Sequence, residues 1–289
     1  MTSEPRSIGI TRKRVLAVYG HPDDEGQVTG TLAAFIAAGN AVTLICATRG
    51  EVGEISDPTL STPDTLWYTR ELELRAAMAQ IGLADVRFLP YRDSGMDGTP
   101  ENADVRSLHQ QPAPVAVPAI LEIMREVRPH FVFTWQPDGG YGHPDHIAVH
   151  HHTLAAFDAC ADASAYPEAG PPWKPERLYW GARTSRLFAT FRLEMERRGL
   201  LPEPLTEEAR QRIAEMLARP EPAVSVIIDT TAYIEVKRRA SSMHRSQFGE
   251  NSMFARIPED LRTQFFGEER FYRARPESIE GDPPRHDFA

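Results

Sequence analysis

Short apolar runs rich in β-branched residues recur along this chain, and stretches long enough for helices separate them. This alternation is typical of βαβ units, in which helices join parallel strands and cover both faces of one sheet. We therefore expect an α/β fold with a Rossmann-like, mostly parallel sheet. The predicted strands are residues 15–19, 41–47, 86–89, 131–134 and 224–228, and the predicted helices are 27–38, 62–80, 115–127 and 144–157.

The second half of the chain is interrupted by prolines. Pro-rich stretches at residues 165–176 and 218–223 predict surface linkers on either side of a helical insert, 185–217. We expect a single domain over residues 1–289. Its core covers about 14–160, a cap or C-terminal helical/β lobe covers about 176–275, and a frayed tail covers 276–289. A long polar loop, 93–114, is predicted to overhang the site.

Two clusters of imidazoles and carboxylates follow predicted strands. The first is His21-Pro-Asp-Asp-Glu25 and the second is Tyr141-Gly-His-Pro-Asp-His146. In doubly wound sheets, ligands bind beyond the carboxyl ends of the strands, so both clusters belong at one edge. His21, Asp24 and His146 would supply two imidazoles and a carboxylate, a set that holds zinc in hydrolases and leaves a position open for water. We expect one Zn²⁺ per chain.

The neighbouring residues fit the hydrolysis of an amide. Asp23 lies beside the predicted ligand Asp24 and is our candidate general base. His143 lies one helical turn before His146 and is expected to stabilise the oxyanion as an imidazolium. Either Asp23 or His143 would protonate the leaving amine, and the residues alone do not choose between them.

Simpler interpretations stay open for several of these residues. The acidic turn after the first strand could be a solvated helix cap, and Asp145 is expected only to favour the N-terminus of its helix. His146 and His150 have the i,i+4 spacing of a metal-binding pair, but no Glu accompanies them, so we expect His150 to pack within the helix. His244 and Gln247 could reach the site from the C-terminal part, although a lone histidine after Met243 is more often structural.

The composition of the chain argues against some classes of binding partner. A formal net charge of −9 argues against a nucleic-acid partner, because nucleic-acid binding needs a concentrated basic footprint. The 2 cysteines form no Cys-x-x-Cys pair, and the sequence contains neither a signal peptide nor an apolar run of membrane-spanning length. We expect a cytoplasmic enzyme that acts on a small molecule without a nucleic-acid or membrane partner. A homo-oligomer is left open.

The motifs resemble those of the LmbE/PIG-L family of metal-dependent de-N-acetylases, mainly over residues 14–160. Beyond these residues the likeness reduces to Met243-His-Arg-Ser-Gln247. The motifs in the family's order are His21-Pro-Asp-Asp-Glu25, Thr48-Arg-Gly-Glu51, Arg70-Glu-Leu-Glu73, Asp93-Ser-Gly-Met96 and Tyr141-Gly-His-Pro-Asp-His146.

The resemblance implies a zinc-dependent enzyme that removes an N-acetyl group from an N-acetylglucosamine-like molecule. It implies the same metal ligands and the same roles for Asp23 and His143. It also implies that Arg70 and Asp93 bind sugar hydroxyls and that Tyr141 lies near the acyl group. Without the family, Arg70 would be interpreted as a helix-surface ion-pair partner of Glu71 or Glu73.

Other functions remain as alternatives. One branch of the family cleaves thiol-sugar conjugates and typically carries a lysine shortly after the first motif, but residues 26–29 contain none. A non-catalytic sugar- or nucleotide-binding module is disfavoured, because no Gly-x-Gly-x-x-Gly follows the first strand. A two-metal phosphoesterase would need more ligands than these clusters provide.

Overall fold

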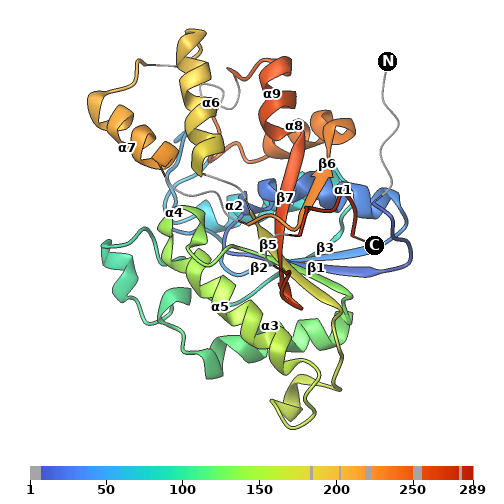
Figure 1. Ribbon diagram of the computed structural model, residues 1–289. Helices are drawn as coiled ribbons and strands as arrows, with labels where there is room; N and C mark the ends of the chain where they lie inside the picture. Colours follow the sequence, from blue (N-terminus) through green and yellow to red (C-terminus); the bar gives the residue numbers. More distant parts are fainter. Residues whose placement is uncertain are drawn as a thin grey trace.

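The computed structural model describes residues 8–182, 185–201, 203–218, 223–249, 256–279 and 282–288. Within them, strands form a 7-stranded sheet of order β3-β2-β1-β4-β5-β7-β6 (Figure 1). Strands β1 to β5 run parallel, and β7 runs antiparallel to both of its neighbours. The predicted mostly parallel sheet is confirmed. The strands are β1 (Arg14–Tyr19), β2 (Ala41–Cys46), β3 (Asp85–Phe88), β4 (Phe131–Thr134), β5 (Arg177–Gly181), β6 (Val226–Asp229) and β7 (Glu268–Arg275).

Helices cover both faces of this sheet, as the sequence predicts. On one face α1 (Thr29–Ala37) and α2 (Leu66–Ala79) pack against α8 (Ile234–Ser241). On the other face α3 (Ala113–Val127) packs against α5 (Pro144–Ala159), as Figure 1 shows. No helix in the described ranges has the length and apolar character needed to cross a lipid bilayer.

The order of the strands places a topological switch point just before the two sequence clusters. Strand β1 lies between β2 and β4, so the connections on its two sides leave in opposite directions. This is a topological switch point, where doubly wound sheets bind ligands beyond the carboxyl ends of their strands. β1 ends at Tyr19 and β4 ends at Thr134, so the His/Asp clusters that follow both strands start at this switch point.

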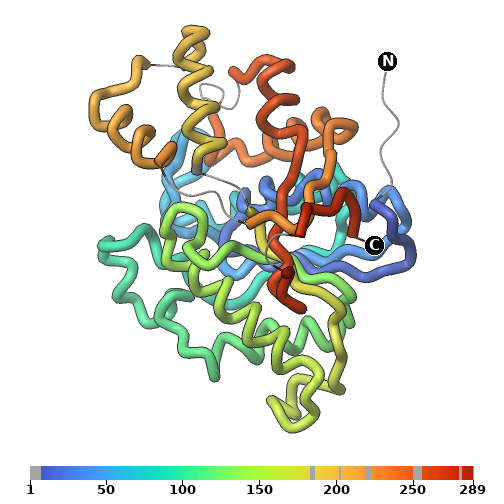
Figure 2. Tube along the Cα trace, in the orientation of Figure 1, coloured from blue at the N-terminus to red at the C-terminus, as the bar shows by residue number. Residues whose placement is uncertain are grey.

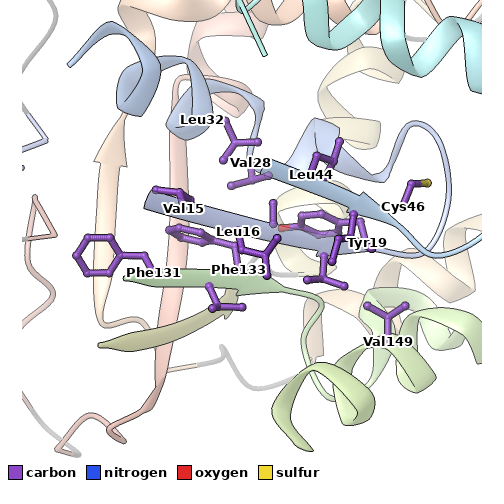
Figure 3. Packing of buried hydrophobic residues seen from close by; sticks show 14 of the residues in the cluster. Val15, Leu16, Tyr19, Val28, Leu32, Leu44, Cys46, Phe131, Phe133 and Val149 are labelled. Atoms are coloured by element: carbon purple, nitrogen blue, oxygen red, sulfur yellow. The ribbon is translucent and has the colours of Figure 1, made fainter. Parts of the chain in front are cut away.

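The core is built around β1. Its residues Val15 to Val18 have no solvent exposure, because helices cover both faces of the strand. Figure 3 shows the side chains of Leu32 and Leu44 on the neighbouring segments and the rings of Phe131 and Phe133 on β4 close to this strand. A rigid strand therefore leads directly into the first cluster.

The C-terminal part of the chain contributes strands that the sequence analysis did not predict. β5 follows the first Pro-rich stretch. In β7 the buried Glu269 and Phe271 alternate with the exposed Glu268 and Arg270, which is the pattern of a strand with one solvated face. β6, predicted as 224–228, forms the sheet edge beyond β7. The predicted C-terminal lobe thus extends the central sheet.

The remaining helices of this part pack on one another. They are α6 (Ser185–Arg197), α7 (Glu207–Ala218) and α9 (Glu259–Phe266). Phe191 and Met195 of α6 share a small apolar cluster with Leu261 of α9. The helical insert predicted over 185–217 corresponds to α6 and α7. Of the second predicted linker, residues 219–222 lie outside the described residues, as do the first 7 residues of the chain.

The C-terminal tail differs from the frayed segment that we expected. Phe288 is 1% exposed, and its ring centroid lies 5.2 Å from that of Phe35 and 5.1 Å from that of Tyr179. The backbone N–H of Phe288 donates to the carbonyl of Ile8. In Figure 2 the red C-terminal segment returns to the strands. Phe288 is packed because it completes an aromatic part of the core, whereas most other described residues of the tail are exposed.

We predict that Phe288→Ala lowers the free energy of unfolding by about 3 kcal/mol, because it leaves a cavity among buried rings. Urea denaturation measures this change. Phe188→Ala is the matched control, since Phe188 is 38% exposed and should lose much less stability. Equal losses in the two variants would show that the tail does not pack in solution.

Candidate active site

The structure brings the three predicted metal ligands together. Nδ1 of His21 lies 3.0 Å from Nε2 of His146, and Oδ2 of Asp24 lies 3.6 Å and 3.3 Å from these two atoms. Zinc bonds of about 2.0–2.2 Å in a tetrahedron place neighbouring ligand atoms about 3.3 Å apart. All three side chains are buried. The triangle of donor atoms therefore has the size of a zinc site.

The hydrogen bonds of the two imidazoles point their lone pairs at each other. Nδ1 of His146 contacts the carbonyl of Gly139 at 3.0 Å, so this nitrogen carries the hydrogen and Nε2 is the acceptor. Nε2 of His21 contacts the carboxylate of Asp145 at 3.1 Å, so Nδ1 of His21 is the acceptor in the neutral ring. Two lone pairs 3.0 Å apart repel each other unless a proton or a metal ion lies between them. This donor set fits a divalent metal.

Asp24 is held as a charged ligand. Its Oδ2 accepts the backbone N–H groups of Gly20 at 3.0 Å and His21 at 2.8 Å, and the indole N–H of Trp135 at 3.1 Å. Although burial alone would raise it, the imidazoles of His146 and His21 hold the pKa of Asp24 well below its ordinary value. The carboxylate is therefore ionised and fixed in orientation before any ligand arrives.

Two other groups of side chains lie close enough to share an ion, namely His21 with His143 and His146, and His21 with Asp93 and Asp145. The hydrogen bonds favour the Asp24 set over both. Nδ1 of His143 accepts the backbone N–H of Asp145 at 3.2 Å, so Nε2 of His143 carries the hydrogen. In the second group, Nε2 of His21 contacts the carboxylate of Asp145 at 3.1 Å, so this nitrogen carries the hydrogen and is not the acceptor that a metal ion needs.

The charge state expected for His143 is wrong. Because Nδ1 of His143 accepts a backbone N–H, the ring is neutral in this structure. Burial lowers the pKa of His143 to about 4, and the neighbouring His21 and His146 act in the same direction. The group that faces the site is a neutral N–H donor.

Asp23 adopts an unusual backbone conformation beside the ligands. Its φ is 104°, in the left-handed region, and its side chain is 20% exposed. Burial raises the pKa of Asp23 to about 6, against the opposing charge of Arg70. This carboxylate is partly accessible and follows directly on the turn that carries the ligands, next to Asp24 in the chain, which suits a general base.

Arg70 is not the surface residue that its sequence context suggests. It is 4% exposed and donates to the carbonyls of Gly50 at 3.0 Å and Pro22 at 2.6 Å, and to Oδ2 of Asp23 at 3.2 Å. Glu71 pairs with other arginines instead, and Glu73 accepts hydrogen bonds from a C-terminal serine. The helix-surface interpretation of Arg70 is therefore wrong.

The other predicted substrate contacts border the same centre. Oδ1 of Asp93 lies 3.5 Å from Nε2 of His21 and accepts the backbone N–H of Gly95. Tyr141 lies in the short α4 (Gly139–Gly142), with its ring centroid 5.1 Å from that of His146 and its side chain 63% exposed. Asp93 thus lies at the floor of the site and Tyr141 at its solvent side.

Sequence reasoning missed the role of Asp145. This residue has no solvent exposure, and its carboxylate accepts from the backbone of Ser94 at 2.8 Å and of His109 at 3.2 Å while contacting His21. It therefore orients a predicted ligand and anchors the loop after β3. A carboxylate hydrogen-bonded to a ligating imidazole is a recurring feature of metal sites. Its place between two histidines of one motif was the available signal.

A second missed contact joins Glu25 to His244. Oε1 of Glu25 lies 2.6 Å from Nε2 of His244, and both side chains are at most 2% exposed. The two residues are separated by 219 positions, so no local spacing could predict the pair.

Comparison with known proteins shows the family of this chain. Residues 16–157 match the family model described as "PIG-L: GlcNAc-PI de-N-acetylase". The 1D-myo-inositol 2-acetamido-2-deoxy-alpha-D-glucopyranoside deacetylase of Rhodococcus erythropolis is 40% identical over 249 residues, covering 81% of this chain and 81% of the relative. The chain belongs to the PIG-L family. All the residues of the His21/Asp24/His146 centre lie within the segment that matches the family model.

Solved structures show how widely the fold occurs. The N,N'-diacetylchitobiose deacetylase of Pyrococcus horikoshii superimposes with a TM-score of 0.64 at 20% identity, covering 94% of this chain and 87% of that chain. The 4-carboxy-2-hydroxymuconate hydratase GalB of Pseudomonas putida superimposes with a TM-score of 0.60 at 18% identity, covering 94% of this chain and 100% of that chain. These similarities show the PIG-L-like fold alone, so the chemistry must be argued from the side chains.

We predict that His146→Ala loses bound metal, because it removes one of three donors, whereas His150→Ala retains it. Nδ1 of His150 bonds to the carbonyl of Trp135, and no group of potential ligands in the described chain includes this histidine. Elemental analysis after dialysis against zinc measures the number of zinc ions per chain in each variant. Full occupancy in His146→Ala would assign the ligand role to His143 or His150.

Proposed function

We propose that this protein is a zinc-dependent hydrolase that removes the N-acetyl group of a small N-acetylglucosamine-containing molecule and releases acetate and a free amine. The observation that carries the proposal is the meeting of His21, Asp24 and His146 around one point, with Asp23 next to Asp24 in the chain. Membership of the PIG-L family supports the same reaction. We propose one Zn²⁺ per chain, held by these three side chains.

A zinc ion held there would supply a Lewis acid that lowers the pKa of a water molecule and polarises the acyl oxygen. The residues of the chain supply the proton transfers. Asp23 accepts a proton from the attacking water as the new C–O bond forms. It returns this proton to the nitrogen as the C–N bond breaks, so the amine leaves in neutral form.

We propose that His143 acts on the acyl oxygen. Its Nδ1 is occupied by the backbone N–H of Asp145, so its Nε2–H is the donor that remains. We assign this neutral N–H to the oxygen that becomes negatively charged when water adds to the carbonyl. A preformed donor of this kind is effective because it needs no reorganisation during the reaction.

The relatives suggest the substrate. The relative named above is a deacetylase of 1D-myo-inositol 2-acetamido-2-deoxy-alpha-D-glucopyranoside, and we infer that this chain acts on the same class of pseudodisaccharide. Asp93 and Tyr141 border the centre and are proposed to contact the sugar and the acyl group. Arg70 donates a hydrogen bond to Asp23 and so orients it. We also propose that Arg70 contacts a sugar hydroxyl of the substrate. An amidase acting on thiol-sugar conjugates is the competing function.

An amine-release assay on zinc-loaded protein tests the substrate. We expect the highest kcat/KM on N-acetylglucosaminyl-inositol, lower values on chitin oligomers, and the lowest values on acylated thiol-sugar conjugates. Acetate release in equal amount confirms which bond is cleaved. Preference for a thiol conjugate would support the amidase, and binding without turnover of any substrate would support a non-catalytic module.

A second prediction concerns the general base. Asp23→Asn should keep bound zinc but lower kcat by about 10²- to 10⁴-fold, because the amide cannot accept the proton. Metal content and kcat are measured on the same preparation. Asp64→Asn, at an exposed position of the chain, is the matched control and should match the wild type. A near-wild-type rate in Asp23→Asn would remove this residue from the mechanism.

A further inference from the structure

The proposed general base is held at its main chain as well as at its carboxylate. The backbone N–H of Asp23 donates to Oε2 of Glu25 at 2.9 Å, and the other carboxylate oxygen of Glu25 lies 2.6 Å from Nε2 of His244. His244 is 1% exposed and Glu25 is 2% exposed. A continuous chain of hydrogen bonds therefore runs from His244 through Glu25 to the main chain of Asp23.

Asp23 needs such a restraint because of its conformation. Its φ of 104° lies in a region that side-chain-bearing residues rarely occupy. Strained conformations of this kind persist only where surrounding contacts over-determine them, and they cluster at functional sites. Here the amide of Asp23 is bound by Glu25, and its carbonyl accepts the N–H of Gly26 at 3.1 Å. If the amide were released, the turn could relax and carry the carboxylate away from the ligands.

The segment that supplies His244 is itself fastened to the wall of the site. The backbone N–H of Ser246 donates to Glu73 at 2.7 Å, and its hydroxyl donates to the same carboxylate at 2.6 Å. Glu73 lies on α2, the helix that also carries Arg70. The C-terminal segment 243–247 thus supports both groups that contact Asp23, namely Glu25 at its amide and Arg70 at its carboxylate.

We propose that Glu25 and His244 are positioning residues for the general base, and that the C-terminal segment 243–247 completes the catalytic centre by holding Asp23 in its strained conformation. This inference rests on the proposed function for its kinetic consequences. Neither side chain belongs to the proposed ligand set or to the proton transfers assigned above. Glu25 and His244 therefore affect the reaction rate only by positioning Asp23.

Kinetics of the zinc-loaded full-length protein test the proposal. His244→Ala and Glu25→Ala should each lower kcat by about 10- to 100-fold, the usual effect of removing an outer-shell partner, while KM and zinc content stay within twofold of the wild type. The double variant should be no slower than the worse single variant, because the two residues act as one unit. If the fold-losses in kcat of the two single variants multiplied in the double variant, the proposed chain of hydrogen bonds from His244 through Glu25 to Asp23 would be overturned.

A conservative variant separates positioning from general destabilisation. Nδ1 of His244 has no hydrogen-bond partner within the described part of the chain. His244 can therefore move its hydrogen to Nδ1 and accept at Nε2 from the amide of Glu25→Gln, whose oxygen still accepts the N–H of Asp23. Glu25→Gln should thus recover most of the activity lost in Glu25→Ala. Failure to recover it would contradict the proposed hydrogen bonds.

Hydrogen exchange gives a readout that does not depend on turnover. Amides in the peptide covering residues 20–27 should exchange faster in His244→Ala and Glu25→Ala than in the wild type. His152→Ala is the matched control, because His152 is a similarly buried histidine whose imidazole is not part of this chain of hydrogen bonds. Unchanged exchange in His244→Ala would refute the proposal that His244 positions Asp23 through Glu25. A wild type without deacetylase activity but with this exchange pattern would refute the proposed function alone.

Discussion

Buried negative charge around His21 is the constraint on which the rest of the site depends. Asp24, Asp93 and Asp145 all lie within 3.6 Å of the ring nitrogens of His21, and each is at most 8% exposed. Burying several carboxylates together is unfavourable unless cations and hydrogen-bond donors compensate for the lost hydration. The carboxylates raise the pKa of His21 well above its ordinary value, although burial alone would lower it. Such a centre is arranged to hold positive charge.

The fold meets this requirement with main-chain donors at the switch point of the sheet. N–H groups from the turn after β1 bind Asp24, and N–H groups from the loop after β3 bind Asp93 and Asp145. These N–H groups lie in turns that directly follow rigid strands. They are therefore already ordered, and little conformational entropy is lost when a ligand binds. A related fold supports a hydratase, which shows that the sheet positions side chains without choosing the reaction.

The C-terminal part is joined to the same centre. Glu269 on β7 accepts the backbone N–H groups of Gly30 and Thr31 at 2.9 Å and 2.7 Å, and so caps the first turn of α1. Lys237 of α8 pairs with the same carboxylate at 2.6 Å. A Cβ at Gly30 would lie 2.7 Å from Cβ of Thr230, so only glycine allows this close approach. The strands and helices after residue 176 therefore stabilise the segment that carries the first cluster.

The parts that could be predicted depend on local patterns. The sequence predicts β1 and β4, because a strand buried on both faces is a continuous apolar run. It also predicts the two clusters after them, because His and Asp residues of the ligand type lie within a few positions of one another. β7 was missed because its alternation includes five charged residues, Glu268, Glu269, Arg270, Arg273 and Arg275. Phe288 was missed because a single ring in a polar tail carries no periodicity.

By itself the sequence determined the class of sheet, the edge at which the chemistry lies and the three side chains proposed as metal ligands. Only the tertiary structure decided the protonation pattern of the imidazoles, the burial of Arg70 against Asp23, and the contacts of Asp145 and His244. These properties depend on which atoms lie within hydrogen-bond distance. Partners such as Glu25 and His244 are brought together by the packing of the whole sheet, across 219 positions of chain.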